Sequence, residues 1–495
     1  MLTYISTRDE NLKLTPAEAI IQGLAVNGGL FVPSNLEDIK VDYKNIIQKD
    51  YLDIAEEIFT KFFPDLAREI PTIVKNSYTN KFSDESITPL IKLNNNYILE
   101  LFLGPTCAFK DVALSALPNL MMAAIKKANI RDHILILTAT SGDTGSAAMK
   151  GFSNVPNTSI ITFYPDDGIS DIQRLQMTTQ EATNVTACAI KGNFDVAQSG
   201  VKEIFKSLKG LNNGVMLSSA NSINIGRLVP QIVYYFSAYK QLVDNSEIKI
   251  GDEITFTVPT GNFGNIMAGW FAMKMGLPIK KLYCASNKNN VLTEFLKTGH
   301  YNKNRGFFKT SSPSMDILVS SNLERLLYYI CGSENTAKYM NDLANTGEYQ
   351  IEKEELEKIQ EIFVGICSND NDGASAIDNV FQANSYLMDT HTAIAYASYK
   401  NYQDDNNSCY KNVILATASP YKFPYSVLEA LKQDYSLDDK QNLIELQEVT
   451  NSAMPEQLSK IFEKKIYSKD VIHPENMRKY VEDKIAEICN NNVNK

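Results

Sequence analysis

The segment "GPTCAFKD" (residues 104–111) places a single lysine, Lys110, inside a stretch that is otherwise mostly apolar or small. Such a lysine can be a surface residue whose carbon chain packs against the protein while its amine stays in water. It can also be an amine that burial keeps out of water, with a pKa low enough for it to act as a nucleophile. The local sequence by itself favours the surface lysine, because desolvated catalytic lysines are rare. The rest of the chain has to separate the two interpretations.

Two glycine-rich segments have the composition of anion-binding loops. "TATSGDTG" (138–145) and "PTGNFGN" (259–265) each follow a β-rich run and precede a run of helix formers. The free N–H groups and the dipole at a helix start attract anions, and glycine lets the backbone approach a phosphate closely. A glycine after a strand can equally be a simple turn. Neither segment fits the dinucleotide or nucleotide-triphosphate fingerprints, so those two classes lose support.

A third stretch, "SSANSINIGRLVPQIVYYF" (218–236), carries Arg227 behind small hydroxyl and amide residues. An arginine in that setting suits a second anion. The alternative is an ordinary capped helix, with Ser222 or Asn224 as the N-cap and Arg227 on the surface. One lysine in an apolar frame, a phosphate-type loop and a second anion pocket together indicate a pyridoxal 5′-phosphate enzyme. The lysine would hold the aldehyde and one glycine-rich helix start the phosphate.

The elements that must position these residues follow an α/β pattern. Short apolar runs predict strands at 133–140, 158–165, 252–260 and 412–419. Helical stretches separate them, which indicates βα units and a mainly parallel sheet. In an open sheet of this kind, ligands bind beyond the carboxyl ends of the strands. The two glycine-rich segments occupy that position.

The chain divides into three predicted parts. Residues 1–85, with a predicted helix at 51–63, form a small N-terminal accessory domain, and residues 86–430 form a catalytic region of two α/β subdomains. Residues 431–495 form a C-terminal helical extension that ends in a charged helix at 475–488. The polar runs "SNDNDGAS" and "QDDNNS" predict loops.

Composition excludes several classes of protein. The chain has 495 residues and a net charge of −10, so it is a poor nucleic-acid or membrane-surface binder. No apolar run reaches transmembrane length, and no secretory signal is visible. The seven cysteines are widely spaced without a CxxC pair, which argues against a zinc site and a disulfide framework. We expect a reduced, cytoplasmic protein with no metal and no obligate protein partner.

The ordered set of motifs resembles the threonine synthase family. The motifs are "GPTCAFKD", "TATSGDTGSAA", "NSINIGR", "PTGNFGN", "ASNKNNVLTEFLKTG", "SPSMDILVSSNLERL" and "DTHTAIAY", preceded by "YISTRD" and "LAVNGGLFVP". Each motif is weak alone, but the order from about residue 4 to about residue 425 is highly specific. The resemblance implies a tryptophan-synthase β-like fold (fold type II). Two open, mainly parallel twisted sheets would be flanked by helices, with a small N-terminal accessory domain.

The resemblance also implies an activity and a role for each matched residue. The family converts O-phospho-L-homoserine and water to L-threonine and phosphate by γ-elimination and β-addition, the last step of threonine biosynthesis. Lys110 would be the Schiff-base lysine, and Thr417 would face the pyridine nitrogen. The cofactor phosphate cup would be formed by Gly261, Asn262, Phe263, Gly264 and Asn265. Asp143 would bind the cofactor, and the small-molecule substrate would be bound by Thr140, Ser141, Thr144, Asn221, Ser222 and Arg227.

Two departures and three alternatives accompany this assignment. Many family members have histidine where Ser419 stands, and some have asparagine in place of Asp143. A serine/threonine dehydratase-like enzyme or a phospho-amino-acid lyase would keep the same cofactor, and a non-catalytic sensor would bind phosphorylated amino acids without chemistry. The anion pocket around Arg227 argues against a dehydratase. Lys110 argues against a sensor, and we expect no other lysine in a comparable setting.

Overall fold

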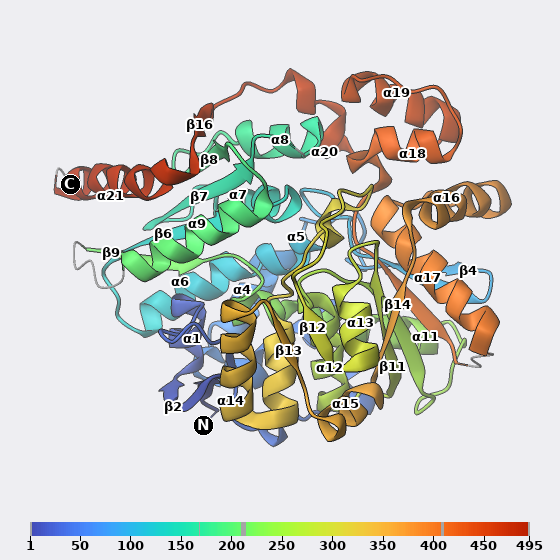
Figure 1. Cartoon of the computed structure of the whole chain (residues 1–495), viewed down its shortest axis with the longest axis horizontal. Helices are drawn as coiled ribbons and strands as arrows, with labels where there is room; N and C mark the ends of the chain where they lie inside the picture. Colours follow the sequence, from blue (N-terminus) through green and yellow to red (C-terminus); the bar gives the residue numbers. More distant parts are fainter. Residues whose placement is uncertain (1, 168, 209–213, 407–409, 494–495) are drawn as a thin grey trace.

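The computed structural model describes residues 2–167, 169–208, 214–406 and 410–493. Two sheets form the centre of the molecule, with helices packed around them (Figure 1). The larger sheet contains, in spatial order, β14 (Phe363–Cys367), β11 (Ile279–Ser286), β10 (Ile254–Pro259), β15 (Asn412–Ala416), β5 (Asn96–Glu100) and β4 (Leu90–Leu93). Every pair in it is parallel except β4 with β5.

The smaller sheet has five strands, all parallel. It contains β16 (Asp470–Ile472), β8 (Val185–Ile190), β7 (Thr158–Pro165), β6 (His133–Ala139) and β9 (Val215–Ser219). The four strands predicted from apolar runs are β6, β7, β10 and β15, and their residues are almost entirely buried. Strands covered on both faces must be apolar throughout, so their continuous apolar runs could be recognised as strands in the sequence. The predicted α/β fold class is confirmed.

The N-terminal part packs against elements of both halves of the molecule: α3 (Tyr51–Phe62) contacts α11 (Pro230–Asp244), and α1 (Pro16–Gln22) contacts α6 (Leu117–Lys127) and β9. Its three-stranded antiparallel sheet has the order β2 (Asp9–Leu14), β1 (Tyr4–Ser6), β3 (Phe31–Pro33). The predicted helix at 51–63 is α3 (Tyr51–Phe62), which buries Ile54, Ile58 and Phe62 at helical spacing. Asp50 caps this helix by accepting a hydrogen bond from the Asp53 N–H. The apolar face of α3 contacts α11 (Pro230–Asp244).

The C-terminal part contains helices and one unpredicted strand. Helices α19 (Asp439–Thr450) and α21 (Met477–Val493) agree with the predicted helical character. Between them, β16 pairs with β8 and becomes an edge strand of the smaller sheet. β16 has three largely exposed residues, so it shows no alternating or apolar pattern that a sequence could reveal. The division of the chain at 85/86 and 430/431 stays a prediction.

The two polar runs predicted as loops are mostly helical. Within "SNDNDGAS", α16 (Asp370–Asn384) begins with Asn369 as its N-cap and Asp372 completing a capping box. Asn, Asp and Ser are favoured at helix starts as well as in turns, so the loop prediction was wrong for a recognisable reason. α17 (Thr390–Asn406) continues into "QDDNNS", whose last two residues lie outside the described residues.

Candidate active site

One cavity gathers the predicted site residues. Thirteen of the fourteen line it: Lys110, Thr140, Ser141, Thr144, Asn221, Ser222, Arg227, Gly261, Asn262, Phe263, Gly264, Asn265 and Thr417. The fourteenth, Asp143, lies just behind the cavity wall and contacts Lys110. These residues come together because their segments follow the carboxyl ends of β5, β6, β9, β10 and β15. β6 lies between β7 and β9, and β10 between β11 and β15, so both sheets open at the points where such folds bind ligands.

Lys110 is held beside Thr417 by a short bridge between their segments. Ala108 and Ala418 form an isolated antiparallel pair. The Phe109 N–H donates to the Thr417 carbonyl at 2.8 Å, and the Ser419 N–H donates to the Cys107 carbonyl at 3.0 Å. Lys110 then begins α5 (Lys110–Leu114). The lysine and the end of β15 are therefore fixed relative to each other by backbone bonds.

The surroundings of Lys110 favour the buried amine over the surface lysine. Its side chain is 12% exposed, and its Nζ lies 3.6 Å from Asp143 Oδ2. Burial lowers the pKa of Lys110 to about 8, Asp143 opposes that shift, and the positive charges of Arg227 and Lys422 add to it. Part of the amine is therefore uncharged near neutral pH, as a nucleophile requires.

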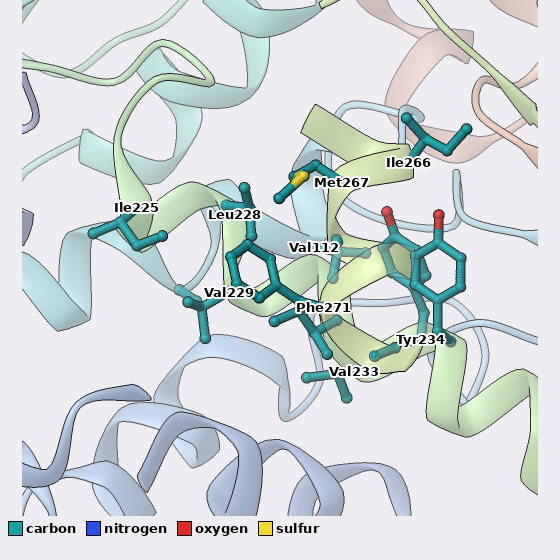
Figure 2. Close-up of a cluster of buried hydrophobic side chains, with 14 of the residues drawn as sticks. Val112, Ile225, Leu228, Val229, Val233, Tyr234, Ile266, Met267 and Phe271 are labelled. Carbon is teal, nitrogen blue, oxygen red and sulfur yellow. The ribbon is translucent and has the colours of Figure 1, made fainter. Parts of the chain in front are cut away.

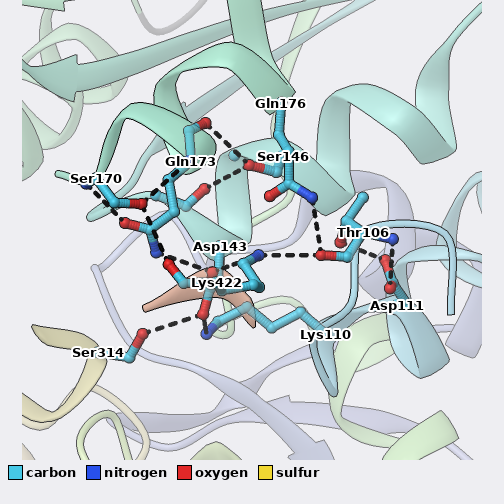
Figure 3. Close-up of polar contacts among 12 residues, drawn as sticks. Thr106, Lys110, Asp111, Asp143, Ser146, Ser170, Gln173, Gln176, Ser314 and Lys422 are labelled. Atoms are coloured by element: carbon cyan, nitrogen blue, oxygen red, sulfur yellow. Dashed lines mark hydrogen bonds and ion pairs between the residues drawn. The ribbon is translucent and has the colours of Figure 1, made fainter. Parts of the chain in front are cut away.

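Asp143 connects Lys110 to a second lysine that the sequence did not single out. Asp143 is the first residue of α7 (Asp143–Phe152), and its Oδ1 lies 2.7 Å from Lys422 Nζ. Gln173 Nε2 donates to Oδ1 at 2.9 Å and Ser314 Oγ to Oδ2 at 3.3 Å (Figure 3). Burial pushes the pKa of Asp143 up, but Lys422 and Lys110 outweigh it and hold that pKa well below its usual range. The expectation that no other lysine occupies a comparable setting was wrong.

The "GNFGN" loop is arranged for close approach to an anion. Phe263 has a left-handed backbone (φ 61°), and α12 (Gly264–Met275) starts at the next residue. The first N–H groups of a helix have no partner within it, so those at Gly264 and Asn265 are available to a ligand. The Asn265 Oδ1 accepts from Tyr234 at 2.5 Å and from Tyr235 at 3.0 Å. Its Nδ2 is buried and has no hydrogen-bond partner among the described residues.

A hydrophobic cluster holds the helices that carry these loops. Figure 2 shows side chains from α5, α10 (Ile225–Leu228), α11 and α12 packed together. Its labelled members are Val112, Ile225, Leu228, Val229, Val233, Tyr234, Ile266, Met267 and Phe271. The helix of Lys110, that of Arg227 and that of the "GNFGN" loop therefore share one core.

Arg227 lies in the cavity wall and not on the surface. It is 2% exposed, and burial lowers its pKa to about 10. Its Nη1 donates to the Ala220 carbonyl at 2.9 Å, while its Nε is buried without a partner among the described residues. The alternative interpretation, a capped helix with Arg227 on the surface, was right only about the cap: Asn224 caps α10 by accepting a hydrogen bond from the Gly226 N–H. A buried guanidinium with an unused donor fits an incoming anion.

Several predicted site residues form hydrogen bonds that stabilise the loops around the cavity. The Thr140 Oγ1 accepts from the N–H groups of Gly142 and Gly145, both at 2.9 Å. The Asn221 Nδ2 donates to the Ala139 carbonyl at 2.8 Å, which ties the loop after β9 to the end of β6. These bonds leave the Thr140 hydroxyl proton free for donation.

His391 is a cavity residue to which the sequence assigned no role. Its side chain is 2% exposed. Its Nδ1 lies 2.8 Å from Asp389 Oδ1, and its Nε2 accepts from the Ser314 N–H at 3.1 Å. His391 therefore fixes the loop that brings Ser314 to the cavity. The Asp-Thr-His order in "DTHTAIAY" was the available signal. Ser419 is 1% exposed and not among the residues lining the cavity.

Metal-binding clusters and membrane-spanning helices are absent from the described residues. In the described parts of the chain, no group of three or more His, Cys, Asp or Glu side chains is placed to hold a metal ion. Among the helices formed by those same residues, none is long and apolar enough to cross a membrane.

The cavity-wall donors that lack a hydrogen-bond partner fit pyridoxal phosphate. Lys110 offers an amine with a lowered pKa, and Arg227 Nε and Asn265 Nδ2 are buried donors in the cavity wall without a hydrogen-bond partner among the described residues. Residues 82–417 match the family described as Pyridoxal-phosphate dependent enzyme, which is the class that this fold and cavity define. Residues 3–78 match Threonine synthase N terminus, and residues 392–481 match Threonine synthase, C-terminal. The chain belongs to the threonine synthase family of pyridoxal phosphate-dependent enzymes, and pyridoxal phosphate is its cofactor. The predicted family and cofactor are confirmed.

Similar proteins agree over most of the chain. Threonine synthase from Saccharomyces cerevisiae is 34% identical over 524 residues, which covers 98% of both chains. The yeast threonine synthase crystal structure superposes with a TM-score of 0.86 at 33% identity, covering 98% of this chain and 99% of that one. PLP-bound threonine synthase from Brucella melitensis gives 0.84 at 35%, with the same coverage. Threonine synthase-like 1 from Homo sapiens is 38% identical over 458 residues, 87% of this chain, and the chain spans 61% of that protein's length.

Proposed function

We propose that this protein is a threonine synthase that converts O-phospho-L-homoserine and water to L-threonine and phosphate. The observation that carries the proposal is the presence of two separate anion-binding features in one cavity. The "GNFGN" helix start offers backbone N–H groups, and Arg227 offers a buried guanidinium with an unused Nε donor. The cofactor has only one phosphate. A second phosphate, on the substrate, accounts for the second feature.

The roles of the remaining residues follow from this assignment. Pyridoxal phosphate, when bound, stabilises negative charge that develops on the substrate carbons. Residues Gly261 to Asn265 would bind its phosphate, Asp143 would bind the cofactor near Lys110, and the Thr417 hydroxyl would be the partner of its ring nitrogen. A hydroxyl partner there would leave that nitrogen largely unprotonated, so the cofactor would stabilise negative charge less strongly than it would with an acidic partner.

Lys110 would transfer the protons to and from the substrate carbons. Its amine would take the proton from substrate Cα, move one from Cβ to Cγ, and return a proton to Cα at the end. Phosphate leaves Cγ, water adds its oxygen to Cβ, and Cγ ends as a methyl group. Arg227, Asn221 and Ser222 hold the substrate phosphate until it leaves. Thr140, Ser141 and Thr144 bind the substrate carboxylate.

The alternatives leave parts of the cavity unexplained. The substrates of a serine/threonine dehydratase carry a carboxylate but no phosphate. With the carboxylate bound by Thr140, Ser141 and Thr144, no substrate anion would remain to pair with the buried Arg227, which is costly. A sensor would have no use for a lysine whose pKa burial has lowered. A phospho-amino-acid lyase uses the same residues and differs only in whether water adds to Cβ.

One experiment separates these functions. The purified protein with pyridoxal phosphate is given O-phospho-L-homoserine, and phosphate, threonine and 2-oxobutanoate are measured together. A threonine synthase yields threonine and phosphate in equal amounts. Phosphate with 2-oxobutanoate and ammonia would identify a lyase instead. Binding without phosphate release would identify a sensor, and turnover of L-serine but not of phosphohomoserine would identify a dehydratase.

A further inference from the structure

Lys422 is a second buried lysine behind the cavity wall. It ends the short 3-10 helix Pro420–Lys422, and its side chain is completely buried. Its Nζ lies 2.7 Å from Asp143 Oδ1 and donates to the Thr106 carbonyl at 3.0 Å. Figure 3 shows Asp143 between Lys422 and Lys110. Lys110 lines the cavity, whereas Lys422 is not among the lining residues.

The two lysines share one carboxylate. Asp143 is 2.7 Å from Lys422 Nζ and 3.6 Å from Lys110 Nζ, so its charge is matched first by Lys422. The other neighbouring groups leave Lys422 as the nearer cation to Asp143. Arg227 adds positive charge on the side of Lys110. Asp111 and Cys107 are close enough to Lys422 for its charge to lower their pKa values. Burial nevertheless raises the pKa of Cys107 to about 12, so its thiol is uncharged, and both oxygens of Asp111 already accept hydrogen bonds from Thr106.

The remaining titratable group at the cavity is His391. Its Nδ1 pairs with Asp389, and its Nε2 is occupied by the Ser314 N–H. Both ring nitrogens of His391 are therefore engaged by neighbours other than Asp143. Among the described residues, Asp143 is the carboxylate that faces Lys110.

We propose that Lys422 is a positioning residue that neutralises Asp143 and thereby allows Lys110 to lose its proton and attack the cofactor aldehyde. The inference rests on the proposed role of Lys110. Without Lys422, Asp143 would be a buried carboxylate whose nearest cation is Lys110. An ion pair of that kind favours the charged form of the amine. Lys110 would stay an ammonium group, which has no lone pair for the attack. In that attack the amine nitrogen would form the C=N bond to the aldehyde carbon, and the aldehyde oxygen would leave as water with the two remaining amine protons.

The test measures the protonation of Lys110 directly. Cofactor-free protein is pulse-labelled with acetic anhydride at a series of pH values, and the Lys110 peptide is quantified by mass spectrometry. The wild-type midpoint should lie at about 8. Lys422→Met should raise that midpoint by about 1 pH unit or more. It should slow uptake of pyridoxal phosphate at pH 7.5 by about tenfold for each unit of that rise.

Two further variants make the test specific. Asp143→Asn/Lys422→Met removes both charges, so its midpoint should return to the wild-type value or below it. Lys432→Met is the matched control: Lys432 pairs with Asp378 at the same 2.7 Å, but its side chain is 80% exposed. This control should label Lys110 and take up cofactor like the wild type.

The outcomes decide the proposal in either direction. An unchanged midpoint in Lys422→Met overturns it, as does a double variant that labels like Lys422→Met. If Lys422→Met does not fold, a folded double variant supports the proposal, because the intolerable feature is then the unpaired carboxylate. An unfolded double variant overturns it. None of these readouts involves phosphohomoserine, so a wrong substrate assignment would leave them unchanged.

Discussion

At the scale of single residues, burial has different consequences for the two cations in the cavity wall. It lowers the pKa of Lys110 to about 8 and that of Arg227 to about 10. The lysine thereby gains an uncharged fraction that can act as a nucleophile, while the guanidinium stays charged at physiological pH. One environment can therefore serve covalent attachment of the cofactor and binding of an anion.

Replacing Lys110 tests the covalent role. Lys110→Ala should abolish covalent attachment of pyridoxal phosphate and turnover, because Lys422 does not line the cavity and cannot take over. Borohydride reduction followed by mass spectrometry locates the modified lysine in wild type and variant. Cofactor found on Lys422 in the variant would contradict this expectation.

Replacing Arg227 tests the substrate. Arg227→Ala should keep the bound cofactor, because the "GNFGN" loop is a separate feature. It should lower kcat/KM for phosphohomoserine by roughly 30- to 1,000-fold, which corresponds to about 2–4 kcal/mol for a charge-assisted contact in a closed site. Any slow deamination of unphosphorylated serine or threonine should be nearly unchanged and serves as the internal control. Equal losses on both kinds of substrate would show that Arg227 is structural.

At the scale of elements, the site depends on loops at strand ends, and Gly264 gives a clean test of one of them. A Cβ added there would lie 3.4 Å from Asn322 Nδ2 and 3.6 Å from Ser222 Cβ, which are ordinary contacts. Gly264→Ala should therefore fold normally but weaken pyridoxal phosphate binding, because the methyl group obstructs approach to the loop's N–H groups. Equilibrium dialysis measures the dissociation constant.

Gly306→Ala is the matched control for that loop. A Cβ at Gly306 also has room, with its nearest atom 3.7 Å away on the Phe308 ring, and Gly306 does not line the cavity. This variant should bind cofactor like the wild type. An unchanged dissociation constant in Gly264→Ala would mean that the loop binds something other than the cofactor phosphate.

The sequence predicted the elements whose signal is local. Buried parallel strands such as β6 and β10 are continuous apolar runs, and the glycine-rich loops behind them are visible by composition. The start of α16 was misread, because the residues that cap helices also form turns. The pairing of Lys422 with Asp143 left no local signal, since only the tertiary fold brings these two residues together.

At the scale of the whole molecule, the N-terminal part is tied to the loops around the cavity. Glu324, near the start of α14 (Leu323–Asn345), accepts hydrogen bonds from Thr7 and from Arg8. The neighbouring Asn322 donates to Ser222 Oγ and to the Asn262 carbonyl, so it joins the two loops assigned to phosphates. The accessory part thus supports the spacing between both loops.

Removing Glu324 tests that support. Glu324→Ala leaves Arg8 without its carboxylate partner and should lower the free energy of unfolding by about 1–3 kcal/mol, with Arg8 partly solvated. It should also raise KM for phosphohomoserine, because the loop spacing relaxes. Urea denaturation and steady-state kinetics provide the two values. Lys432→Ala breaks an exposed pair and should cost at most about 1 kcal/mol with no change in KM. A Glu324→Ala variant that matches this control would disprove the coupling.

The strand order also governs how the chain can assemble during synthesis. Asn96 of β5 pairs with Asn412 of β15, and Cys188 of β8 pairs with Asp470 of β16. A nascent chain therefore carries β5 and β8 with one open edge each until late in translation. Contacts so distant in sequence form slowly, and open edges invite pairing with other chains. The catalytic cavity can close only after the ribosome has delivered Thr417, so incomplete chains of this protein should depend on chaperones to stay soluble.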